Sequence, residues 1–124
     1  MTVMIEAREL TKYYGDFRAI ENLTFEVKKG EIIGLLGPNG AGKTTTMRII
    51  TGFMPPSSGT TLIAGFDMVD QSLEARANIG YLPETVPLYT EMTVEGYLSF
   101  MGSIRGMSSK RIRSRIGDVI ESCK

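Results

Sequence analysis

One short glycine-rich loop constrains the fold of this chain more than any other feature. The loop reads Gly37-Pro38-Asn39-Gly40-Ala41-Gly42-Lys43-Thr44 and matches G-x-x-x-x-G-K-[ST] at every fixed position. The run Ile32–Leu36 before it is apolar on both faces, which is typical of a strand buried in the middle of a sheet. Thr44–Ile50 after it reads as a helix. Strand, glycine loop and helix in this order predict a P-loop.

The residue types of the loop suit a polyphosphate. Glycines let backbone N–H groups converge on phosphate oxygens in conformations that a Cβ would obstruct. The helix that follows adds the positive end of its dipole and its unpaired N–H donors. Lys43 supplies a charge for the β- and γ-phosphates, the Thr44 hydroxyl is a ligand for Mg²⁺, and Thr45 is placed to bond an α-phosphate oxygen. The motif alone leaves open ATP or GTP, and hydrolysis or phosphoryl transfer.

Composition excludes several other functions. The 124 residues hold 14 basic and 14 acidic side chains, so the basic excess of a nucleic-acid binder is missing. The chain has no histidine, which excludes histidine-based catalysis or metal ligation within it, and its one cysteine, Cys123, excludes an internal disulfide framework. The N-terminus lacks the pattern of a signal peptide, and no apolar run approaches the roughly 20 residues of a spanning helix. We therefore expect a cytoplasmic location.

Patterning predicts the remaining elements. Residues 4–10 read as a short strand followed by a turn at 14–16, and Leu23–Val27 alternates as a half-buried strand does. The turn at 28–31 would join that strand to Ile32–Leu36 as an antiparallel hairpin. Further expectations are strands at 60–64 and 79–82, a brief helix at 72–77, a loop from 83 to 92, and a helix capped by Thr93 that runs toward Gly106.

A last helix, capped by Ser108 or Ser109, carries a single apolar stripe. The stripe consists of Ile112, Ile116, Val119, Ile120 and Cys123. Packing against a core is the favoured interpretation, with a membrane-surface role for the basic residues as the alternative. The helix reaches Lys124 without a stop signal and with little chain left to cover the stripe, so the sequence looks truncated.

Several separate motifs resemble the ATPase subunits of ABC transporters, in order and spacing over nearly the whole chain. The matching stretches are 10–15, 22–27, 30–31, the loop with its Pro-Asn-Gly-Ala insert and Thr44-Thr45-Thr46, 51–52, 56–59, and Ile79-Gly80-Tyr81-Leu82-Pro83-Glu84. The resemblance implies ATP and Mg²⁺ as ligands. It also implies an α/β P-loop NTPase fold with a RecA-like core, a mostly parallel central sheet, an antiparallel β-subdomain and the start of a helical subdomain. The domain would comprise residues 1–92 as β-subdomain and core, and 93–124 as helical subdomain.

The same resemblance assigns roles outside the loop. Tyr14 would stack on adenine, with Tyr13 as its rival and a strand-end core residue as the alternative reading, and Ala19 would line the base pocket. Glu84 stands where the family usually has the glutamine of its Q-loop. A carboxylate there can ligate Mg²⁺ or sense the γ-phosphate, and a plain loop acid is the alternative. Lys43 and Glu84 are the candidate catalytic residues.

The resemblance also implies partners. Residues 83–94 look like those of ATPases paired with ABC-2-type export permeases, including gliding-motility and multidrug types. We expect a membrane permease, a second ATPase domain in a head-to-tail dimer, and a position peripheral to the plasma membrane. The family's signature sequence, Walker B strand and switch histidine do not occur, so this chain alone is expected to hydrolyse little ATP. The alternatives are a non-transport ABC ATPase in translation or DNA repair, a P-loop kinase or GTPase, and a binding-only fragment.

Overall fold

A computed structural model describes residues 2–38, 40 and 42–124 of the chain. The chain divides into two compact units, Met1–Tyr81 and Leu82–Lys124. The first unit contains every described strand and two helices, and the second contains two helices.

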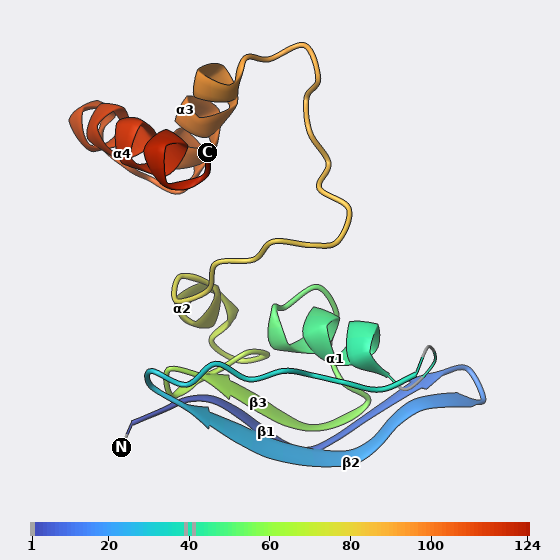
Figure 1. The fold of residues 1–124 in the computed structure, drawn as a ribbon. Coiled ribbons are helices and arrows are strands. Elements are labelled where there is room, and N and C mark those ends of the chain that lie inside the picture. Colours follow the sequence, from blue (N-terminus) through green and yellow to red (C-terminus); the bar gives the residue numbers. More distant parts are fainter. Residues whose placement is uncertain (1, 39, 41) are drawn as a thin grey trace. The chain divides into compact units, whose positions relative to one another are not determined.

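A long β-hairpin forms the base of the first unit (Figure 1). Its strands β1 (Val3–Tyr14) and β2 (Phe17–Lys28) are antiparallel and join through a tight turn at Gly15, whose positive φ of 59° suits glycine. Strand β3 (Ser58–Ile63) pairs antiparallel with β1, and the short β4 (Phe66–Asp67) pairs with β3. The sheet order is therefore β2-β1-β3-β4. The predicted strand at 60–64 is confirmed, and it begins two residues earlier.

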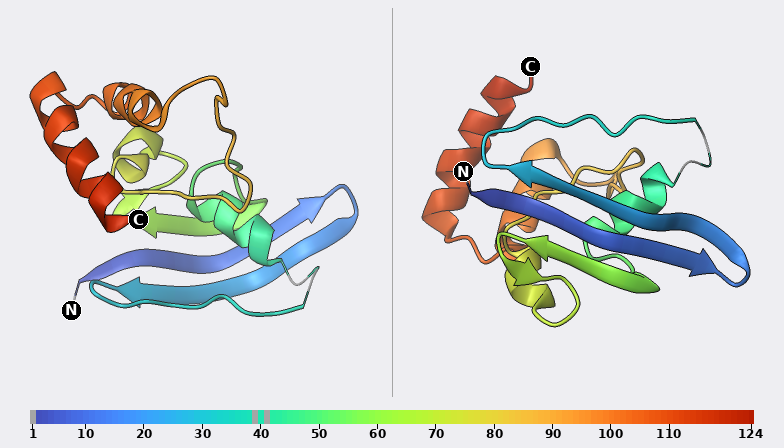
Figure 2. Two further views of the ribbon diagram at one scale, coloured as in Figure 1. Left: turned by 45° about the horizontal axis from the view of Figure 1, so that its top comes forward. Right: turned by 90° about the horizontal axis from the view of Figure 1, so that it is seen from below.

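Two helices, α1 (Lys43–Ile50) and α2 (Ser72–Arg76), cover one face of this sheet, as Figures 1 and 2 show from three directions. Apolar side chains between the helices and the sheet form two adjoining clusters. The first consists of Ala7, Leu10, Ile20 and Ile49, and the second of Ile50, Ile63, Met68 and Ala75. Because α1 contributes to both clusters, the core holds the helix that begins at the glycine loop.

Helix α1 ends as its sequence predicts. Gly52 has a φ of 86°, its N–H bonds the Ile49 carbonyl, and the N–H of Phe53 bonds the Arg48 carbonyl. This pair of bonds is the Schellman motif, which needs a left-handed residue after the cap and so favours glycine. A Cβ on Gly52 would also lie 2.9 Å from the sulfur of Met68. Conformation and space thus both require glycine at this position.

The prediction of a buried strand at Ile32–Leu36 is wrong for this structure. Residues 31–38 form no regular element, and Ile32 is 99% exposed. A strand that is apolar on both faces is stable only between two other strands with a layer on each side. The described residues offer this segment no such neighbours, so the hairpin expected at 28–31 does not form either.

The strand expected at 79–82 and the mostly parallel sheet are also absent from the described part of the chain. Residues 79–82 adopt no regular structure, and every strand pair in the sheet is antiparallel. A parallel sheet here would have needed Ile32–Leu36 and 79–82 as its strands. The antiparallel β-subdomain, the glycine loop and the helix α1 that follows it are the parts of the expected α/β P-loop fold that the described residues form.

The second unit is a helix pair. Helix α3 (Val94–Ile104) starts at Thr93, whose hydroxyl accepts a bond from the Gly96 N–H at 3.0 Å, and α4 (Ser109–Ser122) starts at Ser108 in the same way. Both predicted caps are confirmed. The stripe residues Ile112, Ile116 and Val119 line an apolar groove with Leu98 and Met101 of α3. Ile112 is buried against α3, and Gly102 permits this contact because a Cβ there would lie 2.8 Å from Ile112. Ile120 and Cys123 of the stripe are exposed, so helix packing accounts for only part of it.

Candidate functional site

A pocket of about 170 Å³ lies where the glycine loop meets the end of the β1–β2 hairpin. Its lining residues are Tyr14, Phe17, Ala19, Gly40, Gly42, Lys43, Thr44 and Thr45. Three separate parts of the sequence meet here: the end of β1, the start of β2, and the loop with the first turn of α1. The pocket therefore joins residues that the sequence assigned to phosphate with residues that it assigned to a base.

The glycines of the loop adopt conformations that require glycine. Gly40 has a φ of 86° and Gly42 one of 91°. Gly42 also packs against β2, since a Cβ there would lie only 2.7 Å from the carbonyl oxygen of Ala19. This approach of two backbones brings the loop and Ala19 to the same pocket.

Lys43, Thr44 and Thr45 form the first turn of α1, and all three line the pocket. The first turn contains no acidic side chain, so nothing on the helix itself offsets the positive end of its dipole. The Lys43 ammonium donates to the Gly37 carbonyl, which closes the loop on itself. The Thr46 hydroxyl donates to the Gly42 carbonyl at 2.7 Å and anchors the helix start. An anion in this pocket would meet a cation and unpaired helix N–H groups.

Tyr14 ends β1 and faces the helix start. Its hydroxyl lies 3.2 Å from Thr45 Oγ1 and donates to Met54 Sδ, also at 3.2 Å. The Lys12 ammonium lies 5.8 Å from the centre of the Tyr14 ring. Tyr13, the rival for the aromatic role, does not line the pocket, as expected when neighbouring strand residues point to opposite faces.

Sequence reasoning missed two residues at this site. Phe17 lines the pocket directly across the turn from Tyr14, its partner in the strand register. That spacing, an aromatic on each side of a tight turn, was a usable signal. Met54 reaches Tyr14 from the loop after α1, and nothing in the local sequence indicated it.

Among the described residues, three other predicted site residues do not line this pocket: Gly37, Pro38 and Glu84. Asn39 and Ala41 lie outside the described residues. Gly37 and Pro38 belong to the exposed part of the loop, where Gly37 accepts the bond from Lys43. Glu84 belongs to the second unit and is exposed in an irregular segment. Its part in metal or γ-phosphate binding stays a prediction.

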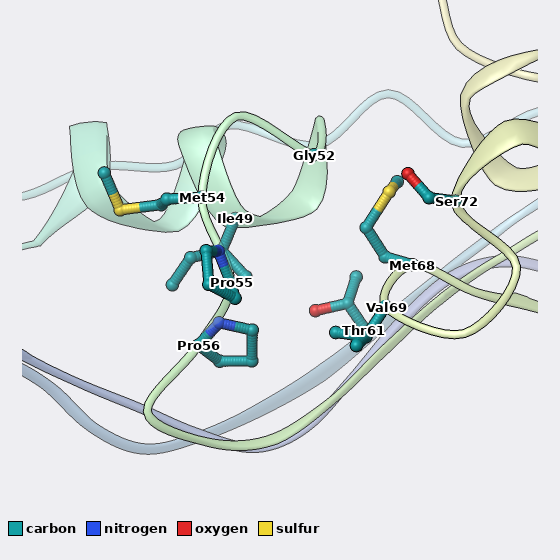
Figure 3. A pocket seen from close by; sticks show the side chains of 9 residues that line it. All are labelled: Ile49, Gly52, Met54, Pro55, Pro56, Thr61, Met68, Val69 and Ser72. Carbon is teal, nitrogen blue, oxygen red and sulfur yellow. The ribbon is translucent and has the colours of Figure 1, made fainter.

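A second pocket of about 210 Å³ lies between α1, β3 and α2 (Figure 3). Its lining is Ile49, Gly52, Met54, Pro55, Pro56, Thr61, Met68, Val69 and Ser72. Thr61 is 3% exposed, and its hydroxyl is the one fully buried side-chain polar atom without a hydrogen-bond partner among the described residues. Met54 lines this second pocket and also accepts the hydrogen bond from Tyr14, which lines the first one.

Comparison with known proteins points to a single family. Residues 20–122 match the family model described as ABC transporter. The chain is 43% identical over 119 residues to the probable multidrug ABC transporter ATP-binding protein YbhF of Escherichia coli, covering 96% of this chain and 21% of that protein. It is 38% identical over 121 residues to the Nod factor export ATP-binding protein I of Cupriavidus metallidurans, covering 98% and 40%.

A solved structure agrees with the sequence relatives. The structure described as the ATP binding subunit of an ABC transporter superposes with a TM-score of 0.78 at 36% identity, covering 86% of this chain and 45% of that one. The chain thus spans less than half the length of these relatives. Within the described residues, every helix is too short or too polar to cross a membrane.

Proposed function

Since this chain belongs to the ABC transporter family, we propose that it binds ATP with Mg²⁺ as the ATP-binding part of a transporter ATPase. One observation carries the proposal. The pocket places Tyr14 and Ala19 beside the lysine, threonines and glycines of the phosphate loop. A ligand that uses all of these residues has a flat base at one end and phosphates at the other.

Each residue of the pocket has a distinct task in this proposal. The loop N–H groups and the start of α1 hold the phosphates, and Lys43 exchanges the Gly37 carbonyl for the β- and γ-phosphate oxygens. Tyr14 stacks on adenine while Ala19 leaves room for the ring. Thr45, buried at the helix start, bonds the α-phosphate. Asn39 and Ala41 complete the loop.

The residues present fit a magnesium ion that arrives with the phosphates. Mg²⁺ keeps several waters and takes only one or two protein ligands besides substrate phosphates. No cluster of three acidic or cysteine side chains occurs within residues 2–38, 40 and 42–124, so a dedicated cage is not formed there. Thr44 lines the pocket next to Lys43 and offers one oxygen ligand, and Glu84 is proposed as a second. The ion neutralises phosphate charge.

The wider proposal concerns the transporter. We place the chain at the cytoplasmic side of the plasma membrane, attached through a permease, with a second ATPase domain as head-to-tail partner. Residues 93–124 would begin the helical subdomain, and residues 1–92 would supply the β-subdomain and nucleotide core. The relatives named for multidrug transport and Nod factor export favour an export permease. In the full assembly, ATP hydrolysis would drive transport, with Lys43 and Glu84 as the catalytic residues of this part.

Isothermal titration calorimetry with ATP, GTP and tripolyphosphate, each with and without Mg²⁺, tests the proposal. We expect the chain to bind MgATP more tightly than MgGTP or tripolyphosphate. Lys43→Ala should reduce affinity for all three ligands at least about tenfold, because a charge-assisted bond contributes about 1.5–3 kcal/mol. Lys29→Ala, a surface lysine in the turn after β2, is the matched control. Equal heats for Lys43→Ala and the unsubstituted chain would refute the phosphate assignment.

A phosphate-release assay addresses the enzyme itself. We expect binding with little hydrolysis, because the chain has no histidine and spans a fraction of its relatives' length. A binding-only fragment is therefore the second candidate function for this chain. Turnover at the rate of an intact ATPase would exclude it.

A further inference from the structure

The hydroxyl of Tyr14 lies between a threonine hydroxyl and a thioether sulfur. It lies 3.2 Å from Thr45 Oγ1 and 3.2 Å from Met54 Sδ. Thr45 comes from the first turn of α1, and Met54 from the loop that follows the same helix (Figure 3). The aromatic ring assigned to the base is thus tied directly to the threonine assigned to the α-phosphate.

The number of protons restricts this arrangement. A tyrosine hydroxyl and a threonine hydroxyl each carry one hydrogen and can accept bonds as well. When Tyr14 donates to Met54, Thr45 must donate its own hydrogen to Tyr14 Oη if the contact of 3.2 Å is to be a hydrogen bond. Thr45 then has no hydrogen left for a phosphate oxygen, which can only accept.

We propose that the Tyr14 hydroxyl is a positioning group that couples the base end of the nucleotide pocket to its α-phosphate end. When Thr45 donates to the phosphate, Tyr14 turns its hydrogen from Met54 to Thr45. A chain from Tyr14 through Thr45 to the phosphate results, and each bond in such a chain strengthens the next. This inference rests on the proposed function and adds a role that stacking by the ring does not supply.

Met54 is suited to release the hydrogen. A thioether sulfur is a weak acceptor. Losing the hydrogen bond from Tyr14 to Met54 therefore costs less free energy than the new bond from Tyr14 to Thr45 contributes. Met54 nevertheless stays close, because it packs against the core cluster and because the neighbouring Pro55 carbonyl accepts a bond from Lys12 at 2.9 Å. The sulfur therefore holds the Tyr14 hydroxyl without competing strongly for it.

A double-mutant cycle on the whole chain tests the coupling, with MgATP affinity measured by calorimetry. Tyr14→Phe keeps the stacking ring and removes the hydroxyl, and Thr45→Val keeps the shape and removes the donor. We expect each substitution to weaken MgATP about two- to tenfold. The double variant should bind no more weakly than Thr45→Val alone. The Tyr14 hydroxyl acts through the Thr45 hydroxyl, and valine at position 45 has none. Fully additive losses would overturn the coupling.

Two further variants separate this role from a structural one. Thr45→Ser restores the hydroxyl and should recover most of the affinity and the sensitivity to Tyr14→Phe. Met54→Leu removes the competing acceptor at nearly constant volume and should bind MgATP at least as tightly as the unsubstituted chain. Weaker binding by Met54→Leu would overturn the proposed exchange of hydrogen bonds.

The outcomes also distinguish the inference from the function beneath it. If the unsubstituted chain takes up neither MgATP nor tripolyphosphate in its folded state, both fail together. If it binds MgATP and the losses are additive, only the coupling through Tyr14 fails, and the nucleotide site remains.

Discussion

Tyr14 and Phe17 stand on either side of the turn at Gly15, and both rings line the pocket proposed for the nucleotide. Tyr14 is 42% exposed and held by its hydroxyl, whereas Phe17 is 63% exposed and has no polar anchor. Stacking needs a ring in a fixed position, so Tyr14→Ala should weaken MgATP by about 1–2 kcal/mol, and Phe17→Ala by less. Tripolyphosphate, which has no base, should bind Phe17→Ala as well as the unsubstituted chain, and with Tyr14→Ala it should lose only what the hydroxyl contributes through Thr45. Calorimetry that gave the larger loss to Phe17 would reassign the stacking residue.

Thr61 and Thr51 are both buried, and only one of their hydroxyls is bonded. The Thr51 hydroxyl donates to the Met47 carbonyl at 2.7 Å, while the Thr61 hydroxyl has no partner among the described residues. A buried polar atom without a partner costs about 1–3 kcal/mol, and an apolar group of the same shape removes that cost. Thr61→Val should therefore raise the free energy of unfolding in urea by about 1 kcal/mol, whereas Thr51→Val should lower it. A loss at Thr61 would indicate a bound water in the second pocket.

Spacing predicts a single residue when a motif fixes both its chemistry and its place. Gly42, Lys43 and Thr45 are such residues, because the loop and the helix that follows determine where they lie. Met54 is not, since its contact with Tyr14 depends on where the loop after α1 crosses the end of β1. That crossing is a property of tertiary packing, which no local pattern encodes.

Among the elements, the helix that starts at the glycine loop has a well-defined glycine cap at its C-terminal end. Its C-terminal Gly52 and the turn residue Gly65 have nearly equal φ values of 86° and 84°, but only Gly52 faces a neighbour, the buried Met68. Gly65→Ala should cost about 1–2 kcal/mol from its left-handed backbone alone. Gly52→Ala should cost about 1 kcal/mol more, because Met68 must also move. Equal shifts of the urea midpoint in the two variants would show that Met68 moves aside at no cost in stability.

Caps and periodicity explain which elements the sequence could predict. Thr93, Ser108 and Gly52 mark helix ends through their own bonds to nearby backbone, so local sequence contains the whole signal. An apolar run such as Ile32–Leu36 does not by itself determine a strand, because a buried strand also needs partner strands from elsewhere in the sequence. This difference accounts for the correct helices and the two wrong strands.

In the molecule as a whole, the fold buries only part of the apolar sequence. Ile32 and Leu36 are almost fully exposed, as is Leu82 at the start of the second unit. The two core clusters of the first unit instead draw on the hairpin, β3, α1 and residues near α2. The chain belongs to a family whose members named above are more than twice its length. The sequence pattern of residues 32–36 therefore predicts a buried strand, whereas the described residues leave this segment exposed.

Ile32→Lys tests whether residues 32–36 are exposed, as in the structure, or form a buried strand, as their sequence predicts. In the structure Ile32 is 99% exposed, so lysine should change the free energy of unfolding by less than about 0.5 kcal/mol and should increase solubility. Ile63→Lys, in a strand position that is 3% exposed, should cost at least about 3 kcal/mol because it buries an unpaired charge. Urea unfolding of both variants measures the contrast. A large loss at Ile32 would mean that residues 32–36 form the buried strand that their sequence predicts, and that the sheet extends beyond its four antiparallel strands.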